Sequence, residues 1–409
     1  MQKQPYFIGL DIGTSKVRCA IGMPETNNPD VSIAVIGVGS AENEGMRKGY
    51  IAHPDEVAKA ITEAVGAAER MAGVRVNSAT INMNGASVQS QSSTGMISTN
   101  SQDRIITDSD RERVEEQATV INMPQNREIV QVFAKNYRVD GQDNIKDPVG
   151  MQGVRLEVDT LVVTAGVQTI RAVEQALSDA QIGIMGRTVS SVAASEVILT
   201  RKQRESGTAI VDIGAGTTNI AIVEDGEIYA VAVLPIGGQN VTNDLAIGLK
   251  TDLEVAEKVK VAYGSLDPAS AVSRKVKVTH EKSEYIFDTA RIYDILVPRF
   301  EELLEEIDKV FAKVKKSKRL PGGVVFVGGV AKTPGLAKFA QEPLELHTRI
   351  GALQHIGGVA DNVNDSEYAS VIGLMMLDGI LGLEASPTSS QKVLGANGLF
   401  TKIKNTLFK

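Results

Sequence analysis

Phe7-Ile-Gly-Leu-Asp-Ile-Gly-Thr-Ser-Lys16, near the start of the chain, recurs near its middle as Ala209-Ile-Val-Asp-Ile-Gly-Ala-Gly-Thr-Thr-Asn219. Each copy has an apolar strand, an acidic residue and a glycine turn with hydroxyl side chains, and a second apolar stretch follows. One such hairpin alone is weak evidence, because Asp-Gly pairs occur in ordinary turns. Two copies facing each other would bring backbone N–H groups and hydroxyls to a nucleotide's phosphates from both sides. The duplication therefore predicts a two-lobed nucleotide clamp.

The residue types in both copies suit phosphate and magnesium. Glycine lets the backbone approach an anion closely, and successive N–H groups in such a turn form an anion-binding concavity. The candidate phosphate-binding residues are Gly13, Thr14, Ser15, Lys16, Gly214, Gly216, Thr217, Thr218 and Asn219. Asp11 and Asp212 are the candidate Mg²⁺ groups, acting through water, because this cation keeps most of its waters and is held by one or two carboxylates plus phosphate oxygens. Neither copy is a Walker loop.

The composition disfavours several classes of protein. At 409 residues, with 43% hydrophobic and 23% charged side chains, the chain has the balance of a soluble globular protein with two or more domains. The net charge of −7, with Lys and Arg dispersed, disfavours a nucleic-acid partner. The single Cys19 allows no disulfide within the chain, which fits a reducing cytoplasm. We find no signal-peptide pattern and no apolar run long enough for a membrane span.

Strand and helix patterns alternate in both halves, and each half contains an insertion, which predicts a duplicated α/β fold. The apolar run 160–166 returns to the apolar α/β pattern of the residues before 84, and it therefore marks the end of the first insertion. The stretch 290–319 is expected to form a helix packed in the second lobe, and a coiled coil is disfavoured because the apolar pattern is short and Pro298 interrupts it. The predicted boundaries are 1–83, 160–205 and 355–384 for the first core subdomain, 84–159 for the insert, 206–242 and 320–354 for the second core, 243–319 for its small subdomain, 385–397 for a linker and 398–409 for a terminal helix.

The two hairpins and a later strand ending in Gly-Gly resemble the actin-like ATPase superfamily. The resemblance implies a duplicated actin-like, ribonuclease-H-like fold that binds ATP and Mg²⁺ between two lobes. A third element borders the adenosine in that superfamily, and it corresponds here to Gly328, Gly329, Val330 and Lys332. The segment Ala256–Lys260 resembles the helix on the adenine and ribose side, which implies roles for Glu257 and Lys260.

Within the superfamily, nearly the whole chain resembles the FtsA family of bacterial cell-division proteins. The similar segments are the position of the insert with its run Asp147–Arg155, the loop after the second hairpin with Gly237, Gly238 and Asn243, the segments 348–351 and 368–374, and the tail. The resemblance implies an inserted α+β subdomain and an ATP-binding protein that polymerises and anchors the FtsZ ring. Its implied partners are FtsZ, further copies of itself in filaments, later divisome proteins and the lipids of the cytoplasmic membrane. It would be a peripheral protein at the cytoplasmic face of the inner membrane, at the division site.

The tail from Gly398 to Lys409 has the pattern of a basic amphipathic helix. At helical spacing one face is apolar, Lys402 lies on the other, and Lys404 and Phe408 fall near the border. The apolar face consists of Leu399, Phe400, Ile403 and Leu407. Such a helix either docks on its own domain or lies at a membrane interface. The family resemblance favours the membrane.

Hydrolysis is expected to be weak. Actin-like enzymes that hydrolyse ATP well tend to place a carboxylate or amide on the first connecting helix, where this chain has serines followed by Glu196. Glu196, with Asp11 and Asp212, is the remaining catalytic candidate, and we expect tight ATP binding with slow turnover. Two alternatives stay open, a pilus-assembly scaffold and a small-molecule kinase. The basic tail disfavours the first, and the lack of a recognisable sugar-binding motif disfavours the second.

Overall fold

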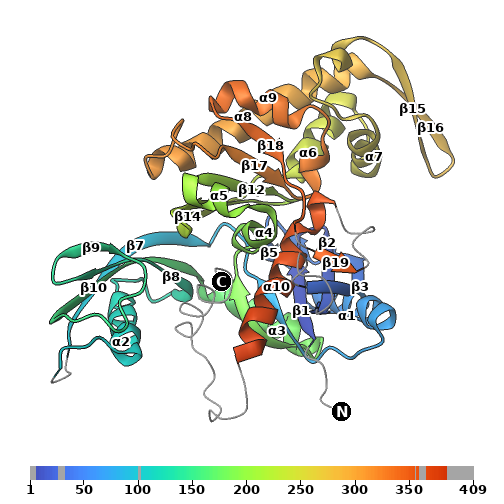
Figure 1. The fold of residues 1–409 in the computed structure, drawn as a ribbon. Coiled ribbons are helices and arrows are strands. Elements are labelled where there is room, and N and C mark those ends of the chain that lie inside the picture. Colours follow the sequence, from blue (N-terminus) through green and yellow to red (C-terminus); the bar gives the residue numbers. More distant parts are fainter. Residues whose placement is uncertain (1–5, 26–32, 100–102, 355, 359–364, 385–409) are drawn as a thin grey trace.

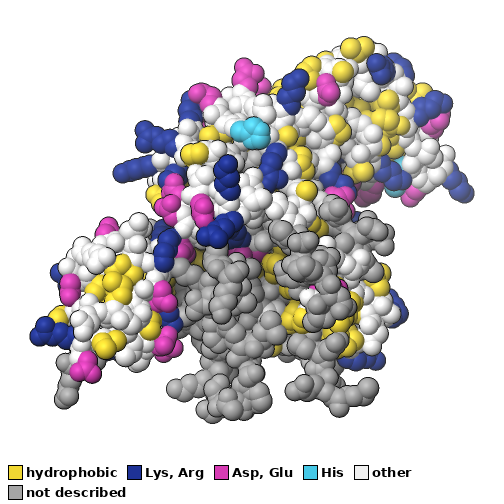
Figure 2. Space-filling view, in the orientation of Figure 1, with side chains coloured by type: hydrophobic (Ala, Val, Ile, Leu, Met, Phe, Trp, Pro, Cys, Tyr) yellow, Lys and Arg dark blue, Asp and Glu magenta, His cyan; other side chains and the backbone are white. Residues whose placement is uncertain are grey.

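The computed structural model describes residues 6–25, 33–99, 103–354, 356–358 and 365–384. Two lobes, each built around a mixed sheet, are stacked in Figure 1, and a third sheet extends to one side. On the part of the face that Figure 2 describes, acidic side chains lie among the Lys and Arg side chains. The linker 385–397 and the predicted tail helix 398–409 lie outside the described residues. Of the helices described, none is long and apolar enough to cross a bilayer.

The first lobe is a six-stranded sheet in the order β11-β6-β1-β2-β3-β19. Its strands are β1 (Phe7–Ile12), β2 (Lys16–Pro24), β3 (Ile33–Glu42), β6 (Ser78–Asn82), β11 (Gly183–Thr188) and β19 (Ile356–Gly358), with the short pair β4 (Met46–Arg47) and β5 (Tyr50–Ile51) beside it. The helices of this lobe are α1 (Pro54–Ala72), α3 (Val167–Asp179), α4 (Ser190–Ile198) and α10 (Ala369–Glu384). Proline at the first position of α1 and a left-handed glycine, Gly73, after its end define that helix.

The second lobe repeats the plan in a five-stranded sheet ordered β14-β13-β12-β17-β18. Its strands are β12 (Thr208–Ile213), β13 (Thr218–Glu224), β14 (Glu227–Leu234), β17 (Val324–Val327) and β18 (Thr348–Ile350). In both lobes the hairpin strand carrying the acidic residue is antiparallel to its successor and parallel to a later strand, β6 in the first lobe and β17 in the second. The helical elements are α5 (Arg201–Ser206), α6 (Gly238–Leu249), α7 (Leu253–Tyr263), η1 (Pro268–Ala271), α8 (Thr289–Lys313), η2 (Gly329–Lys332), α9 (Leu336–Leu344) and η4 (Ser366–Tyr368).

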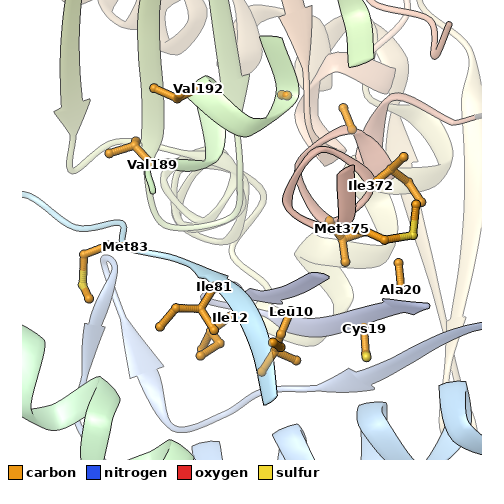
Figure 3. Packing of buried hydrophobic residues seen from close by; sticks show 14 of the residues in the cluster. Leu10, Ile12, Cys19, Ala20, Ile81, Met83, Val189, Val192, Ile372 and Met375 are labelled. Carbon is orange, nitrogen blue, oxygen red and sulfur yellow. The ribbon is translucent and has the colours of Figure 1, made fainter. Parts of the chain in front are cut away.

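Helix α10 packs on the sheet of the first lobe, against β1 and its neighbouring strands. Figure 3 shows Ile372 and Met375 of this helix over Leu10 and Cys19 of the first hairpin. The helix lies close to β1, where a Cβ added to Gly9 would be 2.3 Å from the carbonyl oxygen of Val371. Cys19 is therefore a core residue, and burial raises the pKa of its thiol to about 12.

The insert ends later than the sequence pattern predicted. Its sheet has the order β7-β10-β8-β9, with β7 (Gln89–Ser98), β8 (Arg127–Val139), β9 (Gln142–Ile145), β10 (Arg155–Gly166) and α2 (Asp108–Ala118). Strand β10 is continuous and pairs with β8 as far as Gly166, so the boundary at 159 is wrong. The pattern was misleading because the strand serves two cores. Leu156 packs in the insert's own core, whereas Leu161 and Val163 pack in the main core.

The small subdomain contains the predicted long helix and a hairpin that was not predicted. The predicted helix is confirmed as α8, which continues through Pro298 and packs in the core of the second lobe. Proline inside a helix costs about 3 kcal/mol, but α8 buries a stripe of large side chains that each contribute about 1.5–3 kcal/mol. This stripe includes Ile292, Leu296, Phe300, Leu303 and Ile307. A projecting hairpin, β15 (Lys275–His280) and β16 (Ser283–Asp288), was not predicted at all.

Asp378 on α10 predicts a pH dependence of stability. Its buried carboxylate accepts hydrogen bonds from the backbone N–H of Ile8 (2.9 Å) and from Thr80 Oγ1 (2.7 Å), and burial raises its pKa to about 6. Because this pKa lies above that of the unfolded chain, stability is lost as the pH rises from about 4 to 6. Asp378→Asn is therefore expected to stabilise the protein by up to about 3 kcal/mol at pH 8.

The asparagine can keep the hydrogen bond from the backbone N–H of Ile8 through Oδ1, and its Nδ2 can donate to Thr80 Oγ1 where the carboxylate accepted from that hydroxyl. Urea denaturation at pH 8 and at pH 5 measures the effect, and the gain should shrink at the lower pH. The exposed Asp294→Asn is the matched control and should have the same small effect at both values. A variant less stable than the wild type at pH 8 would contradict this account.

Candidate functional site

The two glycine turns lie against each other between the lobes. In each turn the first glycine closes the hairpin by the same backbone hydrogen bond, from Gly13 N to Lys16 O (3.0 Å) and from Gly214 N to Thr217 O (2.9 Å). A Cβ added to Gly216 would lie 2.7 Å from Thr14 Oγ1, so only glycine allows this approach. The duplicated stretches thus meet in space, as the sequence predicted.

Asp11 and Asp212 occupy equivalent positions at the ends of β1 and β12, and both are buried. Asp11 Oδ1 accepts a hydrogen bond from Asn82 Nδ2 (2.7 Å). Asp212 Oδ2 accepts hydrogen bonds from Ser190 Oγ (2.6 Å) and Ser370 Oγ (3.1 Å). Sequence reasoning missed the contacts of Asn82 and Ser370, which lie far away along the chain.

Burial makes this acidic pair costly to ionise. It raises the pKa of Asp11 to about 7, and the nearby charge of Asp212 adds to the effect, while Arg18 and Asn82 oppose it. Burial raises the pKa of Asp212 as well, against the hydrogen bonds from Ser190 and Ser370. A hard divalent cation fits such a pair, because carboxylate oxygens are among its usual ligands and its charge favours their ionised form.

Arg18 is a site residue that the sequence analysis did not select. It lies directly opposite Asp11 in the β1–β2 ladder, as Asn219 lies opposite Asp212 in the second hairpin. Its Nη2 is 2.7 Å from Glu367 Oε2, and its guanidinium lies 5.5 Å from the centre of the Tyr368 ring. Counting the hairpin register outward from the glycine turn would have identified it.

The candidates on the adenosine side converge on the second turn. Gly238 at the start of α6 donates its N–H to Gly214 O (2.9 Å), and a Cβ added to it would be 2.8 Å from Val330. Lys260 Nζ donates to Gly238 O (3.2 Å) and pairs with Glu257 (2.6 Å). The loop before α6, helix α7 and η2 therefore lie together beside the second glycine turn.

Several other candidates lie at the edge of this group. Asn243 is exposed on α6, and its neighbour Thr242 contacts Lys260 instead (2.8 Å). Lys16 pairs with Glu42 (3.2 Å). Lys332 pairs with Asp365 (2.5 Å) and Glu367 (3.2 Å), so it shares Glu367 with Arg18. Gly237, Gly328 and Gly329 belong to the converging loops, and a Cβ added to Gly328 would be 2.4 Å from Asp212 Oδ1.

Glu196 does not have the position expected of a catalytic group. Its buried carboxylate pairs with Arg204 (2.7 Å) and joins α4 to α5. The residue that α4 presents to Asp212 is Ser190, at the first position of the helix. The geometry therefore gives Glu196 a structural role in place of the predicted one.

Comparison with known proteins agrees with this architecture. A family model described as "Cell division protein FtsA" matches residues 209–373, and one described as "SHS2 domain inserted in FTSA" matches residues 85–164. Cell division protein FtsA of Bacillus subtilis (strain 168) is 34% identical over 378 residues, which are 92% of this chain and 84% of that protein. This chain belongs to the FtsA family. Its Pseudomonas aeruginosa relative, also named Cell division protein FtsA, is 30% identical and covers 92% of this chain and 90% of that protein.

Solved structures confirm the predicted fold class for this FtsA family member. A PilM-PilN type IV pilus biogenesis complex gives a TM-score of 0.66 at 19% identity, covering 91% of this chain and 98% of the other. MreB5 of Spiroplasma citri bound to ADP gives 0.54 at 13% identity, covering 93% and 99%. The fold is that of the actin-like ATPases, and the insert corresponds to the SHS2 domain described for the family.

Proposed function

We propose that this chain binds ATP and Mg²⁺ between its two lobes. The observation that carries the proposal is the meeting of two glycine turns beside a buried pair of carboxylates. The phosphates would contact the turns that contain Thr14 and Thr217, the cation would be held near Asp11 and Asp212, and the adenosine would lie by Glu257, Lys260 and Val330. Magnesium would neutralise phosphate charge there. MreB5 of Spiroplasma citri, which shares the fold, was solved bound to ADP, and this supports nucleotide binding by such a clamp.

Hydrolysis at this site is proposed to be slow. Phosphoryl transfer depends mainly on positioning and charge neutralisation, and the site has groups for both. Activation of a water molecule is the weaker step, because Ser190 already donates its hydroxyl proton to Asp212 and Glu196 is held by Arg204. A nucleotide in this site would act chiefly as a ligand that fixes the positions of the two lobes relative to each other.

We further propose that the protein polymerises, anchors the FtsZ ring to the cytoplasmic face of the inner membrane at the division site, and recruits later divisome proteins. Membership of the FtsA family supports this role and sets aside the pilus scaffold and the small-molecule kinase. The basic tail 398–409 supplies a membrane contact in the proposal, and the small subdomain 243–319 supplies the contact with FtsZ.

Flotation with anionic vesicles tests this role. Purified FtsZ with GTP is mixed with the full-length chain, ATP and vesicles that contain phosphatidylglycerol. We expect FtsZ to float only when the chain is present, and to remain at the bottom with neutral phosphatidylcholine vesicles. If the chain floats and leaves FtsZ behind, the anchoring proposal is incorrect.

A further inference from the structure

The insert contacts the second lobe through the backbone of an edge strand. Strand β14 is the outermost strand of its sheet, so one side of its backbone pairs with no strand among the described residues. Ser90 of β7 donates its hydroxyl to Val231 O (2.6 Å) and accepts from Val231 N (3.2 Å). Lys135 of β8 donates to Tyr229 O (2.8 Å). Alternate residues of an edge strand expose their backbone groups on the same side, and side chains of the insert occupy that side here.

The ring of Tyr229 contacts cations from both parts of the molecule. Lys135 Nζ from the insert is 4.8 Å from the ring centre, and Lys316 Nζ from the second lobe is 4.6 Å from it. Lys316 also pairs with Glu224 on β13. Cation–π contacts of this kind are stabilising, and they are stronger when the cation is desolvated. Burial lowers the pKa of Lys135, which fits a partly desolvated ammonium.

Strands β7, β8 and β10 of the insert all lie against β14, and apolar side chains of both parts are buried in one cluster. Val130 and Leu161 of the insert belong to the same buried cluster as Ile228, Val231 and Val233 of β14. The far end of the insert has a separate core under α2. The insert is therefore packed against the second lobe at its base and supports its own fold at its tip, as its place beside β14 in Figure 1 illustrates.

The insert is also fixed to the first lobe. Arg127 at the start of β8 donates to the carbonyl oxygens of Ser87 (2.7 Å) and Thr164 (3.0 Å), which lie where the insert leaves and rejoins the first lobe. The insert is therefore attached to the first lobe and should move with it, whereas β14 is part of the second lobe. A rotation of the lobes that separates Thr14 from Gly216 and also moves the insert relative to β14 would strain or break the contacts at β14.

We propose that the insert is a brace that stabilises the closed clamp, with Lys135 and Tyr229 as its principal contact, so that the position of the insert and the occupancy of the nucleotide site are coupled. The closed turns and the intact brace occur together in this structure. By linkage, a ligand that binds the closed clamp more tightly also stabilises the brace. Loss of the brace must therefore lower the affinity for that ligand by the same factor. The coupling rests on the proposed nucleotide site, whereas the brace itself does not.

The test uses the full-length protein carrying Lys135→Met and Tyr229→Leu, which remove the cation and the ring but keep apolar bulk. Fluorescent labels at Asp143→Cys in the insert and Lys313→Cys at the end of α8 report the distance between the parts by single-molecule energy transfer. The buried Cys19 should stay unlabelled. Without nucleotide, we expect the double variant to show a broader distance distribution than the labelled wild type. We also expect its affinity for Mg-ATP to be about five- to tenfold lower than that of the labelled wild type.

Lys59→Met, on the exposed face of α1, is the control and should change neither measurement. Ser90→Ala is a milder variant for use if the double variant does not fold, and it should broaden the distribution less. A folded brace variant with wild-type distribution and wild-type affinity overturns the proposal. If the wild type itself binds no ATP, the proposed nucleotide site and its coupling to the insert are wrong. The comparison of distance distributions without nucleotide then still decides whether the brace exists.

Discussion

Deletion of residues 395–409 is expected to release the protein from anionic vesicles and to leave its affinity for ATP unchanged. The deleted segment carries five large apolar side chains, each contributing at most about 1.5–3 kcal/mol at the interface, and lysines that each add about 1 kcal/mol near an anionic surface. Ordering of the helix offsets much of this sum. A single copy should bind weakly, and a filament should bind strongly because its linked tails act at high effective concentration.

Co-sedimentation of the full-length chain and the 1–394 truncation with anionic vesicles, each with and without ATP, measures this effect. Phe400→Glu should reproduce the loss in a chain of full length, because it places a charge on the apolar face. Asn405→Gln, on the polar face, is its control and should pellet like the wild type. Equal pelleting of the truncated and full-length chains would refute the membrane role. A tail-dependent signal that ATP does not enhance would refute the link to assembly.

The sequence was informative wherever local chemistry determines local structure. An acidic residue, a glycine turn and hydroxyls within ten residues specify a hairpin, and duplication of the pattern predicted that the two turns would meet. Arg18 was readable in principle from the register of the same hairpin. These features require no knowledge of distant contacts.

The features that the sequence did not predict depend on tertiary structure. Ser370 lies 158 residues from Asp212 along the chain, and only the packing of α10 brings its hydroxyl to that carboxylate. Glu196 lies on a helix whose residues are nearly all buried, so periodicity could not show which side it occupies. Its partner Arg204 belongs to the next helix. The end of the insert was misplaced because the apolar residues of β10 serve two cores in succession.

Asp212→Asn is expected to have opposite effects on stability and on ligand affinity. Without a bound cation, the wild type buries two carboxylates that raise each other's cost of ionisation, so removal of one should stabilise the ligand-free protein by about 1–3 kcal/mol. The amide can still accept the hydroxyl protons of Ser190 and Ser370. With Mg²⁺ present, loss of a carboxylate that acts on the cation through water should weaken Mg-ATP binding by about 10- to 100-fold.

Thermal unfolding without ligand and ATP titration with Mg²⁺ or with EDTA separate the two effects. The wild type should lose most of its affinity in EDTA, whereas the variant should be nearly insensitive to the chelator. The exposed Asp294→Asn should match the wild type in both measurements. A variant that is less stable than the wild type and still binds Mg-ATP normally would assign Asp212 a purely structural role. Opposite changes, in contrast, would show that the buried charge is kept at the expense of stability because the bound cation requires it.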